Sequence, residues 1–212
     1  MPKGLVGSRH QLGGLAKSCN RGLSYPHTLK NHQESKDHGM KITKEWAMPD
    51  RNTFSIKPIK NFIAKYTRPE YKSIDPFSNT NKIATITNDL DPAMSADHCM
   101  DAIDFLKQFP NNSIDLVLFD PPYSPRQVSE SYKKLGKTVN MKTTQGSYWS
   151  ELKNEIARIT KANGVVLCFG WNSQGIGKTR GFEMEEILMV AHGGNHNDTL
   201  CTMERKNKSL FD

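Results

Sequence analysis

One short segment constrains the fold of this chain more than any other. Residues 114–119 (IDLVLF) are mostly apolar, and turn-forming residues flank them: Pro110-Asn111-Asn112 before, Pro121-Pro122 after. A run of this length and composition is typical of a strand buried on both faces, as in the centre of a parallel sheet. Parallel strands need long crossover connections, usually helices, so the rest of the chain should supply them.

The remaining pattern contains both kinds of element. Apolar residues recur at helical spacing in 52–66, 101–109 and 148–160. Short apolar runs bounded by turn residues predict strands at 71–75, 83–88, 165–169, 184–190 and 200–204. Because strands alternate with helices over most of the chain, we predict an α/β fold with a largely parallel sheet.

Charge and composition set the first 39 residues apart. They hold six Lys or Arg and two acidic residues, so they carry +4 of the net +7 of the 212-residue chain. They are rich in Gly, Ser, His and Asn and show no sustained apolar period, so we predict a disordered basic extension over 1–39 and a folded domain over 40–212. Three interpretations of the extension are open: a nonfunctional segment before a natural start at Met40, a nucleic-acid-binding arm, or an organelle-targeting peptide.

Several classes of protein do not fit this sequence. No apolar run approaches the roughly 20 residues of a membrane-spanning helix, so no membrane partner is expected. The cysteines are scattered without a Cys-x-x-Cys pair, which argues against a zinc ribbon or a disulfide framework and favours the reducing cytoplasm. His192 and His196 have helical spacing, but two glycines between them oppose a helix, so no metal site is predicted.

The residues with the clearest chemistry follow the central strand. Asp120-Pro121-Pro122-Tyr123 comes directly after it, and ligands of open α/β sheets bind beyond the carboxyl ends of strands. The prolines fix the backbone, so a carboxylate, a rigid carbonyl and an aromatic face are held together. This set fits a planar base with an exocyclic amino group, which would donate to Asp120 and a carbonyl near Pro121 and stack on Tyr123. The alternative is a proline-rich turn that only ends a strand.

Residues 114–123 resemble the catalytic motif of the amino-methyltransferases that modify adenine N6 or cytosine N4 in DNA. Three more segments are similar to that family's motifs in the same order, over about residues 52–125: Lys57-Pro58 with Asp75-Pro76-Phe77, then Asp89-Leu90-Asp91-Pro92, then 101–106 with Met100 in place of a glycine. The segments 169–183 and 192–199 are similar to small methyltransferases of phage and prophage origin.

The resemblance implies a Rossmann-like fold and the cofactor S-adenosylmethionine. It implies cofactor-binding roles for Lys57, Pro58, Asp75, Pro76, Phe77, Asp89, Asp91 and Asp101. Asp75 and the backbone near Phe77 would hold the methionine amino group of the cofactor. Asp89, or else Asp91, would accept from its ribose, and Asp101 from its adenine amino group. The implied activity is methylation of adenine N6 in DNA; cytosine N4, RNA, or a catalytically silent nucleic-acid-binding relative are the alternatives.

The chain departs from the family in its first loop. The family pattern is Asp-Pro-Phe-x-Gly-x-Gly, but Ser78-Asn79-Thr80-Asn81 follows Phe77 here. Asn79 and Asn81 tolerate a positive φ and could keep the turn. Too few residues separate Asp75 from the next predicted strand for a helical crossover. We therefore predict an abbreviated first crossover; misplaced strand limits or lost cofactor binding are the alternatives.

Nucleic-acid contacts are predicted mainly from basic residues after the catalytic motif. Residues 124–147 read as a polar loop, and the predicted phosphate contacts are Arg126, Lys133, Lys134, Lys137, Lys142, Lys178 and Arg180. The alternative is a solvated, charged loop. Lysines on a loop give little base readout, so we expect a short recognition sequence or a partner subunit that reads the DNA. The sequence leaves the oligomeric state open.

Overall fold

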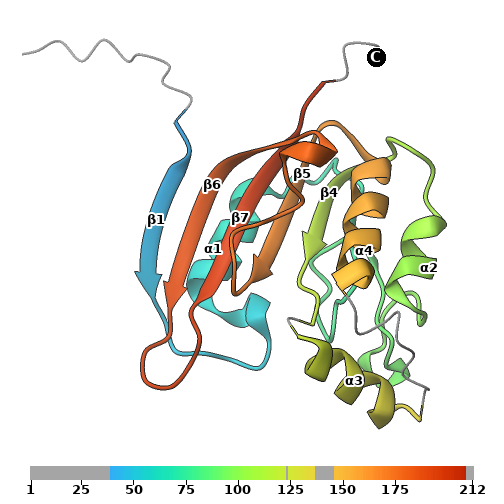
Figure 1. Ribbon diagram of the computed structural model, residues 1–212, viewed down its shortest axis with the longest axis horizontal. Helices are drawn as coiled ribbons and strands as arrows, with labels where there is room; N and C mark the ends of the chain where they lie inside the picture. Colours follow the sequence, from blue (N-terminus) through green and yellow to red (C-terminus); the bar gives the residue numbers. More distant parts are fainter. Residues whose placement is uncertain (1–38, 123, 137–145, 209–212) are drawn as a thin grey trace, which may run out of the picture. The chain divides into compact units, whose positions relative to one another are not determined.

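The computed structural model describes residues 39–122, 124–136 and 146–208. Their strands form one mixed seven-stranded sheet in the order β1-β6-β7-β5-β4-β2-β3 (Figure 1). The strands are β1 (Lys41–Trp46), β2 (Ser73–Asp75), β3 (Ile86–Thr87), β4 (Ile114–Phe119), β5 (Thr160–Gly170), β6 (Phe182–Ala191) and β7 (Thr199–Lys206). β7 runs antiparallel to β5 and β6, and every other pairing is parallel.

Helices cover both faces of the sheet, but unevenly. α1 (Lys57–Tyr66) lies on one face, and α2 (Ala102–Lys107) and α4 (Gly146–Ile159) lie on the other, over β4 and its neighbours (Figure 1). α3 (Pro125–Lys134) follows β4 at the carboxyl edge of the sheet. Three short 3-10 turns complete the described elements: η1 (Thr53–Ser55), η2 (Pro92–Met94) and η4 (Lys178–Arg180).

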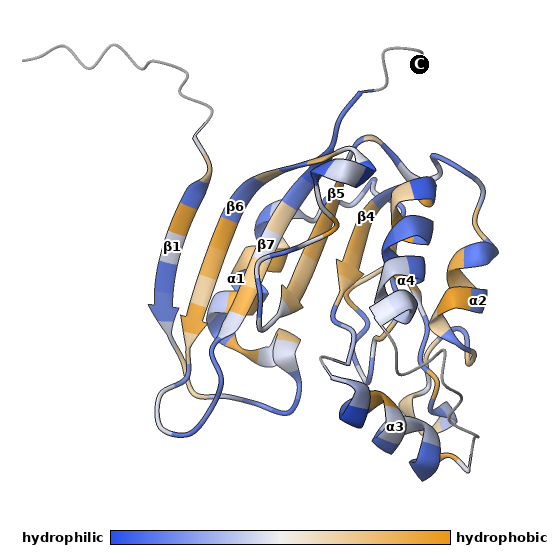
Figure 2. Ribbon diagram, in the orientation of Figure 1, coloured by the Kyte–Doolittle hydropathy of each residue, from blue (hydrophilic) through white to orange (hydrophobic). Residues whose placement is uncertain are grey.

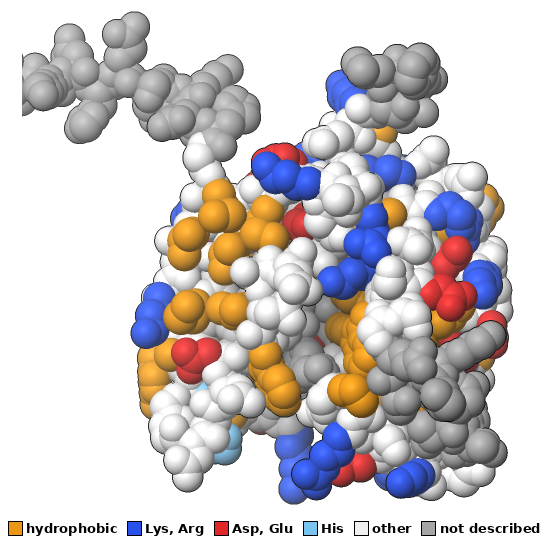
Figure 3. Space-filling view, in the orientation of Figure 1, with side chains coloured by type: hydrophobic (Ala, Val, Ile, Leu, Met, Phe, Trp, Pro, Cys, Tyr) orange, Lys and Arg blue, Asp and Glu red, His pale blue; other side chains and the backbone are white. Residues whose placement is uncertain are grey.

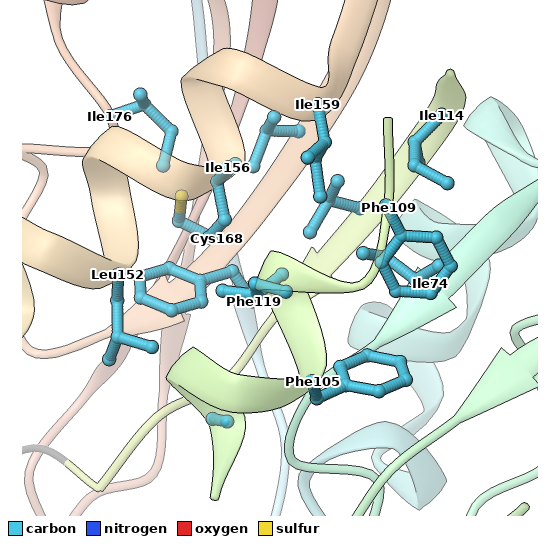
Figure 4. Close-up of a cluster of buried hydrophobic side chains, with 14 of the residues drawn as sticks. Ile74, Phe105, Phe109, Ile114, Phe119, Leu152, Ile156, Ile159, Cys168 and Ile176 are labelled. Carbon is cyan, nitrogen blue, oxygen red and sulfur yellow. The ribbon is translucent and has the colours of Figure 1, made fainter. Parts of the chain in front are cut away.

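β4 separates two apolar cores. Val117 and Phe119 pack against α2 and α4, in the cluster drawn in Figure 4, whereas Leu116 and Leu118 pack on the α1 side. Colouring by hydropathy shows the apolar sides of α2 and α4 turned toward the sheet (Figure 2). The central, doubly buried strand predicted from residues 114–119 is therefore confirmed with the same limits.

The predicted α/β class with a largely parallel sheet is confirmed, and so is the abbreviated first crossover. Residues 76–85 connect β2 to β3 without a helix, although the two strands are parallel. Asn79 has φ 50°, so it supplies the positive φ expected of it, while Asn81 does not. The strands β2 and β3 are shorter than predicted, because polar side chains replace much of their ladder.

Two elements correct the sequence analysis. Residues 124–147 were expected to form a loop, but Ser124 caps α3 by accepting from the Gln127 amide at 3.2 Å, and Pro125 begins it. α3 escapes a pattern search because Val128 is its one fully buried residue. β1 was not predicted either, because its partner β6 lies some 140 residues away in the chain.

Some expectations fall outside the described residues. The predicted extension 1–39 does so except for Gly39, and so do Tyr123, Lys137 and Lys142. In the part of the chain that is described, no helix is long and apolar enough to cross a membrane.

Candidate active site

A cavity of about 570 Å³ opens at the carboxyl ends of β2, β3 and β4. Its walls come from the residues that follow each of these strands, from the turn around η1, from the start of α2 and from α3. Its volume lies within the usual range of sites for small molecules and cofactors. The carboxyl ends of parallel strands meet here, where the sequence analysis placed the chemistry.

The end of β4 brings the predicted catalytic residues to this cavity. Asp120, Pro121 and Pro122 all line it. The indole Nε1–H of Trp149, on α4, donates to the Pro122 carbonyl oxygen at 3.1 Å. Trp149 is half-buried, packs against the core on the α2 and α4 side, and ties α4 to the proline pair. Sequence spacing gave no signal for this contact.

Asp75, at the end of β2, is a buried carboxylate with an unfilled acceptor. Its Oδ1 accepts from the Phe77 amide at 3.0 Å, but its Oδ2 has no hydrogen-bond partner within the described structure. Burial raises the pKa of Asp75 well above its usual value, and the nearby Asp120 and Asp89 carboxylates raise it further. Pro76 and Phe77, which come next, line the cavity. An ammonium group would satisfy both the vacant oxygen and the charge.

Asp89 and Asp91 lie on the cavity wall after β3, and both carboxylates accept hydrogen bonds from backbone amides. Asp89 Oδ2 accepts from the Asn79 amide at 2.8 Å, so it closes the abbreviated loop, and its Oδ1 accepts from the Asp91 amide at 2.8 Å. Asp91 caps η2 by accepting from the Ala93 amide and pairs with Lys134 of α3 at 3.1 Å. The Ala93 amide and Lys134 lower the pKa of Asp91.

Asp101 lines the cavity as the N-cap of α2. Its Oδ1 accepts from the Ile103 amide at 2.8 Å, and its Oδ2 accepts from the Tyr132 hydroxyl of α3. Burial raises the pKa of Tyr132, and the bond to Asp101 raises it further, so the phenol remains a donor. With the Lys134–Asp91 pair, this contact holds α3 across the cavity.

Asn88, which the sequence analysis missed, joins three of these segments. Its side chain is fully buried between the ends of β2 and β3 and the start of α2. Its Nδ2 donates to the carbonyls of Pro76 and Met100, each at 3.1 Å, and its Oδ1 accepts from the Met100 amide at 3.2 Å. No local pattern marks this residue, because its partners are twelve residues away on either side.

Three predicted cofactor residues do not line the cavity: Asp75, which is buried beside the lining residues Pro76 and Phe77, and Lys57 and Pro58. Lys57 and Pro58 form the first turn of α1, where Pro58 is buried and Lys57 is exposed. The neighbouring segment around η1, including Asn52 and Phe54, lines the cavity instead.

The predicted phosphate contacts have different surroundings. On α3, Lys133 is exposed, Arg126 pairs with Glu130 at 2.7 Å, and Lys134 pairs with Asp91. After β5, Lys178 pairs with Glu183 at 3.1 Å. Arg180 donates to side chains of α4, at Asn154 (2.7 Å) and Ser150 (3.0 Å). The structure therefore gives Arg180 a role in holding the loop after β5 against α4.

Several solved structures are similar to this chain at low sequence identity. The strand order with an antiparallel β7 between β5 and β6 is that of the Rossmann-like methyltransferase fold, and β1 extends it at the edge. TrmN from Thermus thermophilus matches 71% of this chain and 49% of its own length, at 16% identity and a TM-score of 0.47. A SAM-dependent methyltransferase from Archaeoglobus fulgidus matches 54% and 50%, at 14% identity and 0.40.

A third match is 1,6-didemethyltoxoflavin-N1-methyltransferase from Burkholderia thailandensis, which covers 72% of this chain and 78% of its own, at 10% identity and a TM-score of 0.48. The chain thus spans about half the length of the first two proteins. No family profile and no curated protein sequence matches it. At these identities the likeness concerns the fold, and the functional proposal rests on the residues of this chain.

Proposed function

We propose that this chain transfers a methyl group from S-adenosylmethionine to the N6 amino group of adenine in DNA. One observation carries the proposal. A single cavity joins Asp120-Pro121-Pro122 at the end of β4 to Pro76 and Phe77 after β2, next to the buried Asp75 carboxylate with its unfilled acceptor. A base-binding motif and an ammonium-binding carboxylate on adjacent parallel strands fit a reaction between a base and an amino-acid-derived cofactor.

The cavity fits the proposed cofactor. Asp75 is buried and does not itself line the cavity, but its neighbours Pro76 and Phe77 do, and its Oδ2 would accept from the methionine ammonium group. Asp89 lines the cavity two residues after β3, where it would accept from the ribose. Asp101 would accept from the adenine amino group in addition to its present bonds, since a carboxylate offers about four acceptor sites. When bound, the cofactor supplies a methyl group on a positively charged sulfur.

The end of β4 would orient the target amino group. Asp120 would accept a hydrogen bond from one N–H of the target amino group. The rigid carbonyl of Pro121 would accept from the other N–H. Because Trp149 already donates to the Pro122 carbonyl, the Pro121 carbonyl is the acceptor that we assign to the base. These two bonds draw the nitrogen from planarity and localise its lone pair for attack, so positioning and electrostatics supply the rate. Asp120 would accept the proton that the nitrogen releases.

The choice of adenine in DNA rests on the Asp-Pro-Pro-Tyr motif and on the basic α3. Tyr123 is proposed to stack on the flipped base. α3 begins two residues later, lines the cavity with part of its length and carries the exposed Arg126 and Lys133, which would contact the phosphates of a duplex with one base flipped. Pairing with a second subunit that reads sequence stays a proposal.

Product analysis tests this proposal directly. The full chain is incubated with S-adenosylmethionine and duplex DNA, and the digested nucleosides are identified by mass spectrometry. We expect N6-methyladenine from the parent. Asp120→Ala should lower turnover by on the order of a hundredfold, because it removes a charged acceptor that acts mainly in the transition state.

Asp104→Ala, which removes an exposed carboxylate of α2, is the matched control and should keep the parent rate. Cofactor affinity, measured by calorimetry, should stay close to the parent value in both variants. N4-methylcytosine, or methylation of RNA alone, would contradict the assigned substrate. Turnover of Asp120→Ala within about threefold of the parent, far from the loss cited above, would contradict the assigned catalytic residue.

A further inference from the structure

The edge strand β1 presents an uncovered apolar stripe. Met40, Ile42, Trp46 and Met48 are exposed by 46, 63, 65 and 67%, and they are four of the six large apolar side chains exposed in the described structure. Ile42 and Trp46 are at even-numbered positions of β1, so the strand turns both to one face, and Met40 and Met48 flank its two ends. Figure 3 shows apolar side chains gathered over β1 and β6, where Figure 1 shows no helix in front of the sheet. Long apolar edges of this kind are rare on isolated proteins.

The register of β1 shows which face carries the stripe. Lys41 pairs with Glu186 of β6, and Glu186 accepts from Lys65 and Tyr66 of α1, so the odd-numbered residues of β1 face α1. The even-numbered residues face the opposite side, next to the half-buried Ile187 and Met189 of β6.

The backbone of β1 is also half unpaired. The Ala47 amide donates to the Ala191 carbonyl at 3.1 Å, which directs the backbone groups of odd-numbered residues toward β6. By strand alternation, the backbone groups of Ile42, Lys44 and Trp46 point outward, away from the sheet. An edge with outward donors and acceptors and an apolar stripe beside it is a template for one more strand.

We propose that the occupant is a second copy of this chain, whose β1 pairs antiparallel with the first about a two-fold axis at Thr43. In this register Lys41 lies opposite Glu45 of the second copy, and Met40 lies opposite Trp46 of the second copy. Each pair occurs twice. Ile42 lies opposite the aliphatic stem of Lys44 of the second copy. Opposite charges and apolar pairs directly across two strands stabilise the pairing.

The neighbouring registers are worse. An axis at Lys44 places the two Lys44 side chains opposite each other, which is destabilising. An axis at Ile42 places Met40 opposite Lys44 and leaves Glu45 without Lys41. The sign pattern of β1 is therefore self-complementary about Thr43, which is what an interface between identical chains requires and an unrelated partner does not.

Charge reversal tests the proposed register. The mass of the full chain in solution is measured by light scattering from low to high micromolar concentration, and a dimer is expected. Glu45→Lys and Lys41→Glu should each be monomeric, because each places like charges opposite each other twice. Mixing the two variants should restore a dimer, since every pair is then Lys opposite Glu. A monomeric parent, dimeric single variants, or no association on mixing would each overturn the proposal.

A cross-link tests the position of the axis and does not depend on how Lys41→Glu folds. In a chain with Cys19 and Cys99 replaced by serine, Thr43→Cys should form an intermolecular disulfide, because a residue on the axis faces its own copy at about 4.5 Å between Cα atoms. Glu45→Cys is the control, since its two copies would lie about 13 Å apart along the strands. Equal cross-linking of both variants would overturn the proposed axis.

Deleting residues 1–38 tests the alternative that this segment of the same chain, and not a second copy, covers the stripe. The dimer should persist in the shortened chain. If the full chain is monomeric and the shortened chain dimerises, the first 38 residues cover the stripe and the proposal is wrong.

Discussion

The two halves of the sheet are held together by different forces. The half formed by β6 and β7, with β1 at its edge, has strands of ten, eight and six residues with continuous ladders. We call it the open half, because no helix covers its front face in Figure 1. The half formed by β2 and β3 beside β4 borders the cavity, and β2 and β3 have three and two residues. The candidate active site thus lies beside the shortest strands of the sheet.

Side chains replace ladder bonds in this cavity half. The Ser73 amide donates to Thr85 Oγ1 and the Thr85 amide donates to Ser73 Oγ, each at 2.9 Å. Asp97 Oδ2 accepts from the Thr87 amide at 2.8 Å, and Asn88 bridges three segments. Buried polar networks are stable only when every member is satisfied. Single polar substitutions should therefore damage the cavity half most, because the open half has continuous ladders and apolar packing besides its two buried carboxylates, Glu186 and Glu204.

The largest expected effect concerns Asp75→Asn. The amide keeps the acceptor for the Phe77 amide but removes the negative charge, so cofactor affinity should fall by tenfold to a hundredfold, equivalent to about 1.5–3 kcal/mol for a hydrogen bond to a charged group. The same change removes a buried, unpaired charge and should raise the melting temperature of the cofactor-free protein. Calorimetry and thermal unfolding check the two outcomes. Reduced stability with unchanged affinity would show that Asp75 serves the fold alone.

The pH dependence of the parent follows from the same carboxyl group. Because the pKa of Asp75 is raised in the folded state, its contribution to stability is present below its unfolded pKa and is lost as pH rises through the higher folded value. Cofactor affinity should change in the opposite sense, since the ionised form binds an ammonium group. In Asp75→Asn both dependences should be absent, and their persistence would assign them to other groups.

Asn88→Ala should act first on stability and only in second place on cofactor affinity. It leaves two carbonyls and one amide without their partner, so the free energy of unfolding should fall by about 2–3 kcal/mol. Met203→Ala, a cavity-creating change on β7, should cost a similar amount. In the folded protein the cofactor affinity should fall for Asn88→Ala and hold for Met203→Ala. Equal cofactor affinities in the two variants would show that cofactor binding does not depend on the cavity half more than on the open half.

Sequence reasoning succeeded where the signal was local. The limits of β4 and a helix beginning next to Asp101, the N-cap of α2, followed from apolar runs and turn residues next to them in the chain. The placement of Asp120 at a cavity followed from one general rule about parallel sheets. Asn79 was expected to adopt a positive φ because asparagine tolerates it, and it does.

It failed where a role depends on distant segments. β1 gains its place from β6, far along the chain, and α3 has too few apolar residues to show a period. Asn88 resembles any polar residue after a strand until three segments fold around it. The carboxylates of Asp91 and Asp101 were expected to face the cofactor. They also cap η2 and α2, which local capping patterns could have indicated.

Trp149→Phe probes a single hydrogen bond in the cavity half. Phenylalanine keeps most of the ring packing but cannot donate to the Pro122 carbonyl, so the proline pair is held less firmly. Turnover should fall about threefold to tenfold, which corresponds to roughly 1 kcal/mol for one such bond. Trp46→Phe, in the open half, is the matched control and should leave turnover unchanged. The two rates are compared at saturating cofactor and DNA, and equal values would remove the role of Trp149.

The smallest effect is expected for single lysines in DNA binding. Lys133→Ala on α3 and Lys44→Ala on β1 remove the same charge from exposed positions in the two halves. If DNA crosses the cavity mouth, Lys133→Ala should reduce the slope of log affinity against log salt by about 1, because one phosphate contact releases about one counterion. Lys44→Ala should leave that slope at the parent value, and cofactor affinity should hold in both.

Fluorescence anisotropy with a labelled duplex, repeated over a range of salt concentrations, measures both slopes. Lys134→Ala makes the test stricter, since Lys134 also pairs with Asp91 on the cavity wall. Its loss should weaken cofactor binding as well as DNA binding, whereas Lys133→Ala should affect DNA alone. If Lys44→Ala changes the slope as much as Lys133→Ala does, the DNA is bound over the open half, and the proposal that DNA binds at the cavity is wrong.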